Sequence, residues 1–452
     1  MKKIMILMVA AFIATLSTSI AQKKGTETVY QQEKKLDWFR NAKLGLFMHW
    51  GPSSVEGVEI SWARQDHPHD HFGKGDKIPN EQYDALYKSF NPVKFDADAW
   101  MKFAKNVGFK YIVFTAKHHD GFSNWHTKLR PDYSISETPF KRDICAELAE
   151  AAHKHGIKLG WYYSTRDWTH PDYLEGDNKK YDDFQNGQIR ELLTNYGEVD
   201  MMWFDHIAGQ WKDYTLKELY EMMYDLQGDD FLVNNRGARF IGRKKGGVYT
   251  APDDATQKLV DGDFDTPEQR IGKFQTDRAW ESCITMNTCP SGGWSYRPDC
   301  GTLTYEEVVQ KFVHTVTGDG NMLLNVGPKA DGTFPAEQVK VLEQFGKWMK
   351  KNGETIYGTR GGPVKNGKWG GMTLKGNKVY VHVLSWPESG NLKIKGLNHK
   401  IVNSKGFNVK KVKVNQKGNE IEIELAEKNR DALDSIIELE LEDNTLTSSK
   451  KL

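Results

Sequence analysis

The sequence of 452 residues predicts a (β/α)8-like barrel followed by a C-terminal antiparallel β-sandwich. Up to about Gly327, short strands that are apolar on both faces alternate with amphipathic helices, which is typical of a parallel sheet covered by helices. No Gly-x-Gly-x-x-Gly motif follows the first strand, and the number of units favours a closed barrel over an open sheet. Beyond Gly362 apolar residues recur with a period of two, as in antiparallel strands.

The barrel strands are expected at apolar runs, with helices between them. The helix that begins after Asp96 is expected to end at Gly108, because Asp is a favoured N-cap and Gly a favoured residue at a helix end. Thr304 and Glu307 form a capping box at the start of a later helix. The expected strands cover residues 44–48, 111–115, 157–163, 199–204, 231–233 and 322–326, and the last helix covers residues 336–351.

Residues 1–21 are predicted to be a secretory signal peptide. Lys2 and Lys3 precede an apolar run at 4–13, and small residues follow up to Ala21. The run is too short to span a bilayer, so we expect an exported protein, periplasmic or secreted, without membrane insertion. The remaining boundaries are expected to divide the chain into a barrel at 22–355, a β-sandwich at 356–443 and a disordered polar tail at 444–452.

Charge and cysteine content exclude several classes of partner. Lys and Arg number 62 against 61 Asp and Glu, so the net charge of +1 leaves no basic excess for nucleic acid or an anionic membrane. The 4 cysteines are too few for a disulfide scaffold and form no paired Cys-x-x-Cys motif, so no zinc site is expected. Cys283, Cys289 and Cys300 allow one disulfide bond, but their spacing does not select the pair.

Polar or aromatic side chains follow each of the first five predicted strands. In a barrel of this type the carboxyl ends of the strands meet at one rim, where the chemistry is done. A coincidence at one strand end would mean little, but a recurrence at five is hard to explain by packing alone. The strand-end residues are His49, His118 and His119, Tyr163, Asp205 and Arg236.

Asp205 is the leading candidate for a catalytic carboxylate. An aspartate at a strand end is often only the N-cap of the next helix, but Trp203 lies two residues earlier on the same face and offers a wall for stacking. Glycoside hydrolysis needs a second carboxyl group, about 5 to 5.5 Å away for retention and farther for inversion. Glu268 and Glu281 are both candidates, and sequence spacing does not choose between them.

The adjacent histidines suggest hydrogen bonding rather than metal binding. His118 and His119 are expected to point in different directions, and no His or Glu partner follows at helical spacing. A neutral imidazole both donates and accepts, which suits substrate hydroxyl groups, and His49 is expected to join this role. We therefore expect no metal and no cofactor. Residues 242–263, rich in Gly and Asp, are expected to form a long loop on the active face.

Six segments resemble glycoside hydrolase family 29, the α-L-fucosidases, in the same order along nearly the whole mature chain. The first is Lys-Leu-Gly-Leu-Phe-Met-His-Trp-Gly at 43–51, and the last is Asn-Met-Leu-Leu-Asn-Val-Gly-Pro at 321–328. Residues 115–122, 203–205, 266–268 and 280–283 supply the others. The resemblance implies a barrel followed by a β-sandwich, in agreement with the pattern described above.

The resemblance also implies a mechanism and a substrate. Asp205 would be the nucleophile of a retaining double displacement, and Glu268 would be the acid/base, with Glu281 as second choice. The substrate would be terminal α-linked L-fucose on an oligosaccharide or glycoconjugate, and residues 356–363 look closer to members that favour α-1,3/1,4 linkages. The implied substrate-binding residues are His49, Trp62, His118, His119, Tyr163, Trp203 and Arg236. Ser61 stands where the family has a Glu before Trp62.

Two other functions stay open at the level of sequence. The first is a barrel glycosidase that acts on a related sugar such as a galactoside. The second is a carbohydrate-binding protein on a barrel that has lost catalysis, although both Asp205 and Glu268 are present. The oligomeric state is not determined by the sequence.

Overall fold

The computed structural model describes residues 33–66, 78–173, 177–205, 216–236, 261–289 and 293–443, with two short strands at 243–244 and 247–248. The predicted signal peptide and the predicted C-terminal tail lie outside the described residues. The predicted loop at 242–263 lies mostly outside them as well. Within it, the structure describes the paired strands β6 (Arg243–Lys244) and β7 (Gly247–Val248) and residues 261–263.

Parallel strands form one barrel sheet in the order β5-β4-β3-β2-β1-β10-β9-β8. The barrel closes between its first and last strands, because Asn234, just after β5, pairs in parallel with Phe264 of β8. The predicted barrel is therefore confirmed. Its strands are β1 (Leu44–Met48), β2 (Tyr111–Lys117), β3 (Lys158–Ser164), β4 (Met201–Asp205), β5 (Leu232–Val233), β8 (Phe264–Asp265), β9 (Ala279–Thr285) and β10 (Asn321–Val326).

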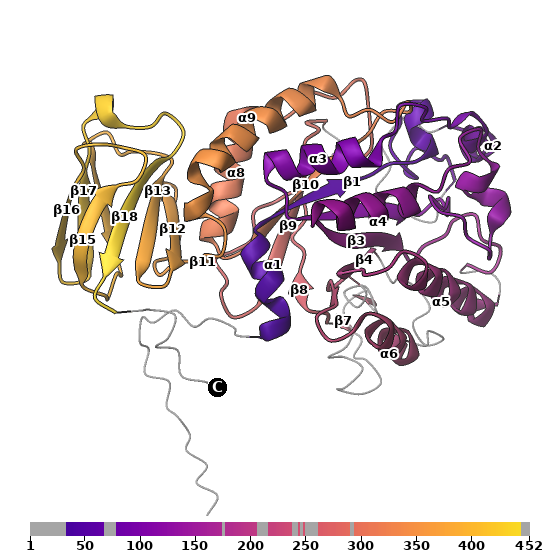
Figure 1. Cartoon of the computed structure of the whole chain (residues 1–452), viewed down its shortest axis with the longest axis horizontal. Helices are drawn as coiled ribbons and strands as arrows, with labels where there is room; N and C mark the ends of the chain where they lie inside the picture. Colours follow the sequence, from indigo (N-terminus) through magenta and orange to yellow (C-terminus); the bar gives the residue numbers. More distant parts are fainter. Residues whose placement is uncertain are drawn as a thin grey trace, which may run out of the picture.

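Helices surround the barrel on its outside (Figure 1). Asp96 caps α3 as predicted, since its side chain accepts the Ala99 N–H, and Gly108 ends the helix in the left-handed region. The capping box of Thr304 and Glu307 is also present, at the start of α8. The described helices are α1 (Asp37–Ala42), α2 (Asn80–Asp84), α3 (Ala97–Val107), α4 (Ile144–His155), α5 (Asn178–Thr194), α6 (Leu216–Gln227), α8 (Tyr305–Thr317) and α9 (Ala336–Asn352).

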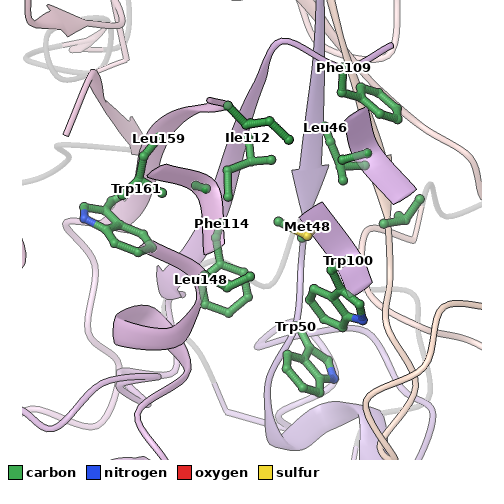
Figure 2. Close-up of a cluster of buried hydrophobic side chains, with 14 of the residues drawn as sticks. Leu46, Met48, Trp50, Trp100, Phe109, Ile112, Phe114, Leu148, Leu159 and Trp161 are labelled. Atoms are coloured by element: carbon green, nitrogen blue, oxygen red, sulfur yellow. The ribbon is translucent and has the colours of Figure 1, made fainter. Parts of the chain in front are cut away.

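Alternation along each strand divides the apolar side chains into two cores. Leu46, Ile112, Phe114 and Trp161 point outward and pack with side chains of the surrounding helices, such as Trp100 of α3 (Figure 2). Burial of each such side chain stabilises the fold by about 1.5–3 kcal/mol. The inward-pointing residues form a separate core inside the barrel: Phe47, Tyr111, Val113, Tyr162, Met201, Trp203, Leu232 and Leu323. The face on which a residue lies therefore decides whether it reaches the barrel interior.

Strand β9 was not predicted, because polar residues interrupt it. Glu281 and Ser282 lie in its middle, and Glu281 pairs with Asn321 of β10 in the parallel register. Both have polar partners: Glu281 bonds to Tyr111 and Trp203 inside the barrel, and Ser282, on the opposite face, bonds to the backbone of Arg270 and Gly272. The strand therefore needs no continuous apolar run. Glu281 therefore lies inside the barrel wall rather than in a loop after a strand.

The C-terminal residues form the predicted antiparallel sandwich, seen at the left of Figure 1 beside α8 and α9. One sheet has the order β11-β12-β13-β18-β15 and the other β14-β17-β16. Val379, Val381, Ile421 and Ile423 are among the residues of the core between them. The strands are β11 (Arg360–Gly361), β12 (Gly370–Lys375), β13 (Lys378–Val383), β14 (Asn391–Lys395), β15 (Ile401–Gly406), β16 (Lys413–Lys417), β17 (Glu420–Glu424) and β18 (Ser435–Leu441).

The structure selects one cysteine pair. Cys289 and Cys300 form a disulfide bond, while Cys145 and Cys283 are free and buried. Cys283 is separated from the other two because it lies on β9 inside the barrel wall. A search of the described helices finds none with the length and apolarity to cross a bilayer.

Candidate active site

The carboxylate of Asp205 lies at the carboxyl end of β4, where strand ends meet at one rim of the barrel. Tyr162 Oη donates a hydrogen bond of 2.8 Å to Asp205 Oδ2, and Arg236 Nη1 donates one of 3.1 Å to Oδ1. A carboxylate with a charged donor on one oxygen and a phenol on the other is held in a single orientation. The residue is 7% exposed, so little water competes for these contacts.

Arg236, just after β5, joins Asp205 to Glu268. Its Nη2 donates a bond of 2.7 Å to Glu268 Oε2, and its Nε donates one of 3.0 Å to Thr266 Oγ1. The guanidinium also lies over the Trp203 ring, 4.8 Å from the centroid. The side chain of Glu268 is 43% exposed, against 11% for that of Asp205. One cation thus holds two carboxylates in different environments, one buried and one open to solvent.

The rings of the two histidines after β2 lie close together, tilted by 38° to each other. Their ring centroids are 4.0 Å apart, and His119 Nε2 lies 3.8 Å from Asp205 Oδ2. The expectation that they point in different directions was wrong, because β2 ends at Lys117 and strand alternation does not extend to the turn that follows. The Nδ1 atoms lie 2.6 Å from serine hydroxyls, that of His118 from Ser61 and that of His119 from Ser164.

His118, His119 and Asp205 each offer one ligand atom within 4.8 Å of the others, a grouping that could hold a metal ion. The charge distribution disfavours this use. The guanidinium of Arg236 already pairs with the same carboxylate, and a second cation beside it in a buried site would be repelled. The arrangement therefore suits hydrogen bonding to neutral hydroxyl groups better than metal binding.

His49 follows β1 and faces the same site. Its Nδ1 lies 2.7 Å from Asn325 Oδ1, and its ring lies 4.9 Å from that of Trp294 and 5.3 Å from that of Tyr162. Burial lowers the pKa of His49 to about 4, so the imidazole is neutral above about pH 5. A neutral imidazole can bind a sugar hydroxyl without bringing a positive charge close to Arg236.

An aromatic wall borders the histidines. Trp62, half-buried, meets His119 edge-on with a centroid distance of 5.3 Å, and Trp168 meets Trp62 at 5.0 Å. Trp168 also lies 5.2 Å from His119. Such rings can stack on the C–H face of a sugar. The structure thus brings the sequence-predicted Trp62 to the site together with a second tryptophan.

Tyr163 is not brought to the site. It is fully buried on the outer face of β3, where its hydroxyl donates to Gln188 Oε1 of α5 at 2.9 Å. The structure corrects the prediction that Tyr163 contacts the substrate. Its neighbour Tyr162 lies at the site instead, because successive residues of a strand point to opposite faces. Tyr162 points inward, donates to Asp205 and stacks on Trp203 at 5.6 Å.

Glu281 lies one layer deeper than the rim. It is fully buried, accepts the Trp203 Nε1–H at 3.1 Å and accepts the hydroxyl of Tyr111. Burial raises its pKa to about 7. Trp203 itself is 2% exposed, forms the floor of the site and lies between the rim and this carboxyl group. Glu281 is thereby separated from the rim by the tryptophan that it holds.

Comparison with known proteins agrees with this geometry. Residues 12–354 match the α-L-fucosidase family. The plasma α-L-fucosidase of Homo sapiens is 31% identical over 381 residues, which cover 78% of this chain and 77% of that protein. The chain belongs to the α-L-fucosidase family. It is accordingly a glycoside hydrolase of family 29, and the tissue α-L-fucosidase of Rattus norvegicus is 30% identical over 380 residues, 78% of this chain and 77% of that protein.

Solved structures of α-L-fucosidases share the fold. Isoenzyme 1 from Paenibacillus thiaminolyticus superposes with a TM-score of 0.76 at 32% identity, covering 91% of this chain and 99% of that one. A family 29 α-L-fucosidase from Bacteroides thetaiotaomicron gives a TM-score of 0.76 at 29% identity, covering 92% and 97%. That structure is of a trapped covalent intermediate in complex with 2-fluoro-fucosyl fluoride.

Sequence patterns did not predict four of the residues that lie at the site of this fucosidase-family chain: Tyr162, Trp168, Trp294 and Asn325. Tyr162 has a usable signal, since it shares an inward face of the barrel with Trp203. Asn325 lies in segment 321–328, one of the segments that resemble the family, and it also donates to Thr285 Oγ1 at 3.0 Å. Trp168 and Trp294 lie on loops, and no periodic pattern places a loop side chain.

The raised pKa of Glu281 predicts a pH-dependent stability for this α-L-fucosidase family member. The folded state keeps the proton up to about pH 7, while the unfolded chain releases it near its ordinary pKa of 4.5. The free energy of unfolding should therefore fall as pH rises through that window, by on the order of 1–3 kcal/mol. Glu281→Gln is neutral at every pH, so its free energy of unfolding should lack this contribution to the pH dependence. Urea unfolding between about pH 5 and pH 8 measures it. Glu337→Gln, at an exposed position on α9, should run parallel to wild type, and parallel curves for both variants would contradict the assignment.

Proposed function

We propose that this chain is an exo-acting, retaining α-L-fucosidase that removes terminal α-linked L-fucose from oligosaccharides or glycoconjugates. The proposal rests above all on the guanidinium of Arg236, which contacts Asp205 and Glu268 at the same time. Membership of the α-L-fucosidase family supports the sugar. The trapped covalent intermediate of the Bacteroides relative supports a covalent route.

In this proposal Asp205 is the nucleophile. Its carboxylate attacks the anomeric carbon, the bond to the aglycone oxygen breaks, and a fucosyl ester of Asp205 forms. Tyr162 and Arg236 keep the carboxylate oriented for this attack. A retaining enzyme needs its two carboxyl groups about 5 to 5.5 Å apart, against about 6.5–9.5 Å for an inverting one. Both carboxylates contact the terminal nitrogens of one guanidinium, which is compatible with the shorter separation.

Glu268 is the proposed acid/base. Its partly exposed side chain lies on the solvent side of Arg236, where an aglycone would leave. It gives its proton to the departing oxygen and later takes one from the water that hydrolyses the ester, after the charge of Asp205 has been consumed. Glu281 fits this role poorly, because Trp203 lies between it and the rim.

The remaining side chains suit a neutral sugar. His49, His118 and His119 offer imidazole nitrogens to hydroxyl groups, and Trp62 offers a ring to a C–H face. Both candidate carboxylates, Asp205 and Glu268, are present and both contact Arg236. This argues against a barrel that only binds carbohydrate. No observation favours a galactoside over a fucoside.

The proposed α-1,3/1,4 preference rests on the likeness of residues 356–363 alone. Arg360 in this segment pairs with Asp319, which precedes β10 and so lies at the opposite end of the barrel from the rim. The segment therefore does not contact the sugar at the rim.

Asp205→Ala should lower kcat/KM for an aryl α-L-fucoside by roughly 10⁴-fold or more, because the ester can no longer form. Azide should restore turnover and give β-fucosyl azide, the inverted product, which also shows that the variant is folded. A 2-fluorinated fucosyl donor should label the wild-type peptide 199–206, as read by mass spectrometry. Label on another peptide, or faster turnover of the matched aryl galactoside, would refute this assignment.

Glu268→Ala should lose most of its activity on fucosylated oligosaccharides but little of its fucosylation rate on aryl fucosides with acidic phenols, because those leaving groups need no proton. Azide should here give α-fucosyl azide, with retention. Glu281→Gln is the matched comparison. Any loss of activity in Glu281→Gln should be the same for every phenol leaving group, and azide should give no new product with this variant. If the two variants exchange these behaviours, Glu281 is the acid/base.

The linkage preference predicts faster release of fucose from α-1,3- and α-1,4-linked trisaccharides than from an α-1,2-linked one. Specificity constants for the three linkages, measured by fucose release at equal enzyme concentration, test it. Equal or reversed values would overturn this part of the proposal and leave the assigned sugar and mechanism untouched.

A further inference from the structure

We propose that Glu59 is a positioning residue that holds the β9–α8 loop on the rim and thereby sets Trp294 as one wall of the sugar site. Of this loop, the structure describes residues 286–289 and 293–303. The inference deepens the proposed function and rests on it for the identity of the sugar. The contacts that support it lie within the protein and need no substrate.

The base of the β9–α8 loop is closed by a bridge and a disulfide bond. Asn287 and Thr302 pair as an isolated antiparallel bridge, and Cys289 is joined to Cys300. Residues 293–299 belong to no helix or strand. Individual hydrogen bonds, rather than periodic structure, must therefore fix the position of this part of the loop.

Glu59, in the segment after β1, supplies the acceptor for the loop backbone. The Trp294 N–H donates to Glu59 Oε1 at 2.8 Å and to Oε2 at 3.0 Å. Next to it, Ser295 Oγ lies 3.4 Å from Glu59 Oε2 and accepts the Ile60 N–H at 2.9 Å. Glu59 is partly buried, and desolvation raises the pKa of its carboxyl group to about 7. The carboxyl group thus finds its hydrogen-bond donors in the loop.

Two glycines allow the close approach of the two segments. A Cβ atom on Gly293 would lie 3.1 Å from Glu59 Oε2. A Cβ atom on Gly57, whose φ is +66°, would lie 2.7 Å from Pro298 Cδ, closer than real Cβ contacts come. The loop therefore packs directly against the segment that carries Glu59.

The ring of Trp294 projects from a backbone that is held on both sides. Its N–H is bound by Glu59, and its carbonyl accepts Asn325 Nδ2–H at 2.7 Å. The ring lies 4.9 Å from that of His49, tilted by 32°, and 5.9 Å from that of Phe47. Trp294 is half-buried, which leaves part of its surface for the C–H face of a sugar. Glu59 thus acts on the site through the tryptophan.

¹⁹F NMR of protein labelled with 5-fluorotryptophan tests the positioning directly, with the Trp294 signal assigned by Trp294→Phe. Glu59→Ala should shift or broaden this signal, because the Trp294 N–H has lost its acceptor. Glu59→Gln should leave it near the wild-type position, since the amide oxygen can accept the same N–H. Glu56→Ala, at an exposed position in the same segment, is the control. An unchanged Trp294 signal in Glu59→Ala would overturn the proposal.

Kinetics on an aryl α-L-fucoside test the consequence. Glu59→Ala, and Glu59→Leu, which keeps the volume but not the acceptor, should lower kcat/KM about 10–100-fold, because displacing a binding group is costly. The loss should appear mainly as a higher KM, whereas a smaller folded fraction would lower kcat and leave KM unchanged. Glu59→Gln should recover most of the activity. An unchanged KM in Glu59→Ala and Glu59→Leu, or an equal loss in Glu59→Gln, would overturn the proposal.

A double variant separates action through Trp294 from independent action. Glu59→Ala combined with Trp294→Ala should have the KM of Trp294→Ala alone, within about twofold. Losses that multiply in the double variant would show that Glu59 acts by another route and would overturn the proposal. Failure of the proposed function is distinguishable, because it would appear as absent fucoside hydrolysis by the wild type, on which the Trp294 signal does not depend.

Discussion

The buried guanidinium of Arg236 is the interaction on which the rest of the site depends. It contacts Asp205 and Glu268, lies over Trp203 and donates to Thr266. The same place is where the barrel closes, between Asn234 after β5 and Phe264 of β8. Closure therefore brings Glu268, 32 residues away from Arg236 in sequence, to the cation. The barrel therefore closes at the same place where Arg236 joins the two carboxylates. The charge of Arg236 offsets the cost of burying Asp205.

Below the point where the barrel closes, the barrel interior supports the rim by polar contacts as well as by packing. Trp203 stacks on Tyr162 of the neighbouring strand and donates to Glu281 below, and Glu281 in turn accepts from Tyr111. A buried polar group is tolerated when its hydrogen bonds are made, as here. The floor of the site is thus tied to the opposite wall of the barrel, and a buried carboxyl group acquires a structural use.

Around the rim, neighbouring side chains hold the imidazoles in place. Burial lowers the pKa of His49, and serine hydroxyls lie at the Nδ1 atoms of His118 and His119. The neutral ring of His49 avoids repulsion with Arg236 and can both donate to and accept from a sugar hydroxyl. Ser61, which stands where the resemblance to the family implies a Glu, makes one of these contacts, with His118 Nδ1.

Local patterns in the sequence determined the barrel, the sandwich, the helix ends at Asp96 and Gly108, and the strand ends that carry Asp205 and Arg236. These features depend on neighbours in the chain, where periodicity and capping act. Only the tertiary structure decided between Tyr162 and Tyr163, placed Glu281 beneath Trp203 and paired Cys289 with Cys300. It also brought Glu268 to the guanidinium of Arg236, which contacts Asp205 as well. Each of these depends on which face of a strand points inward or on where the barrel closes. Both follow from contacts between residues far apart in sequence, which no local pattern contains.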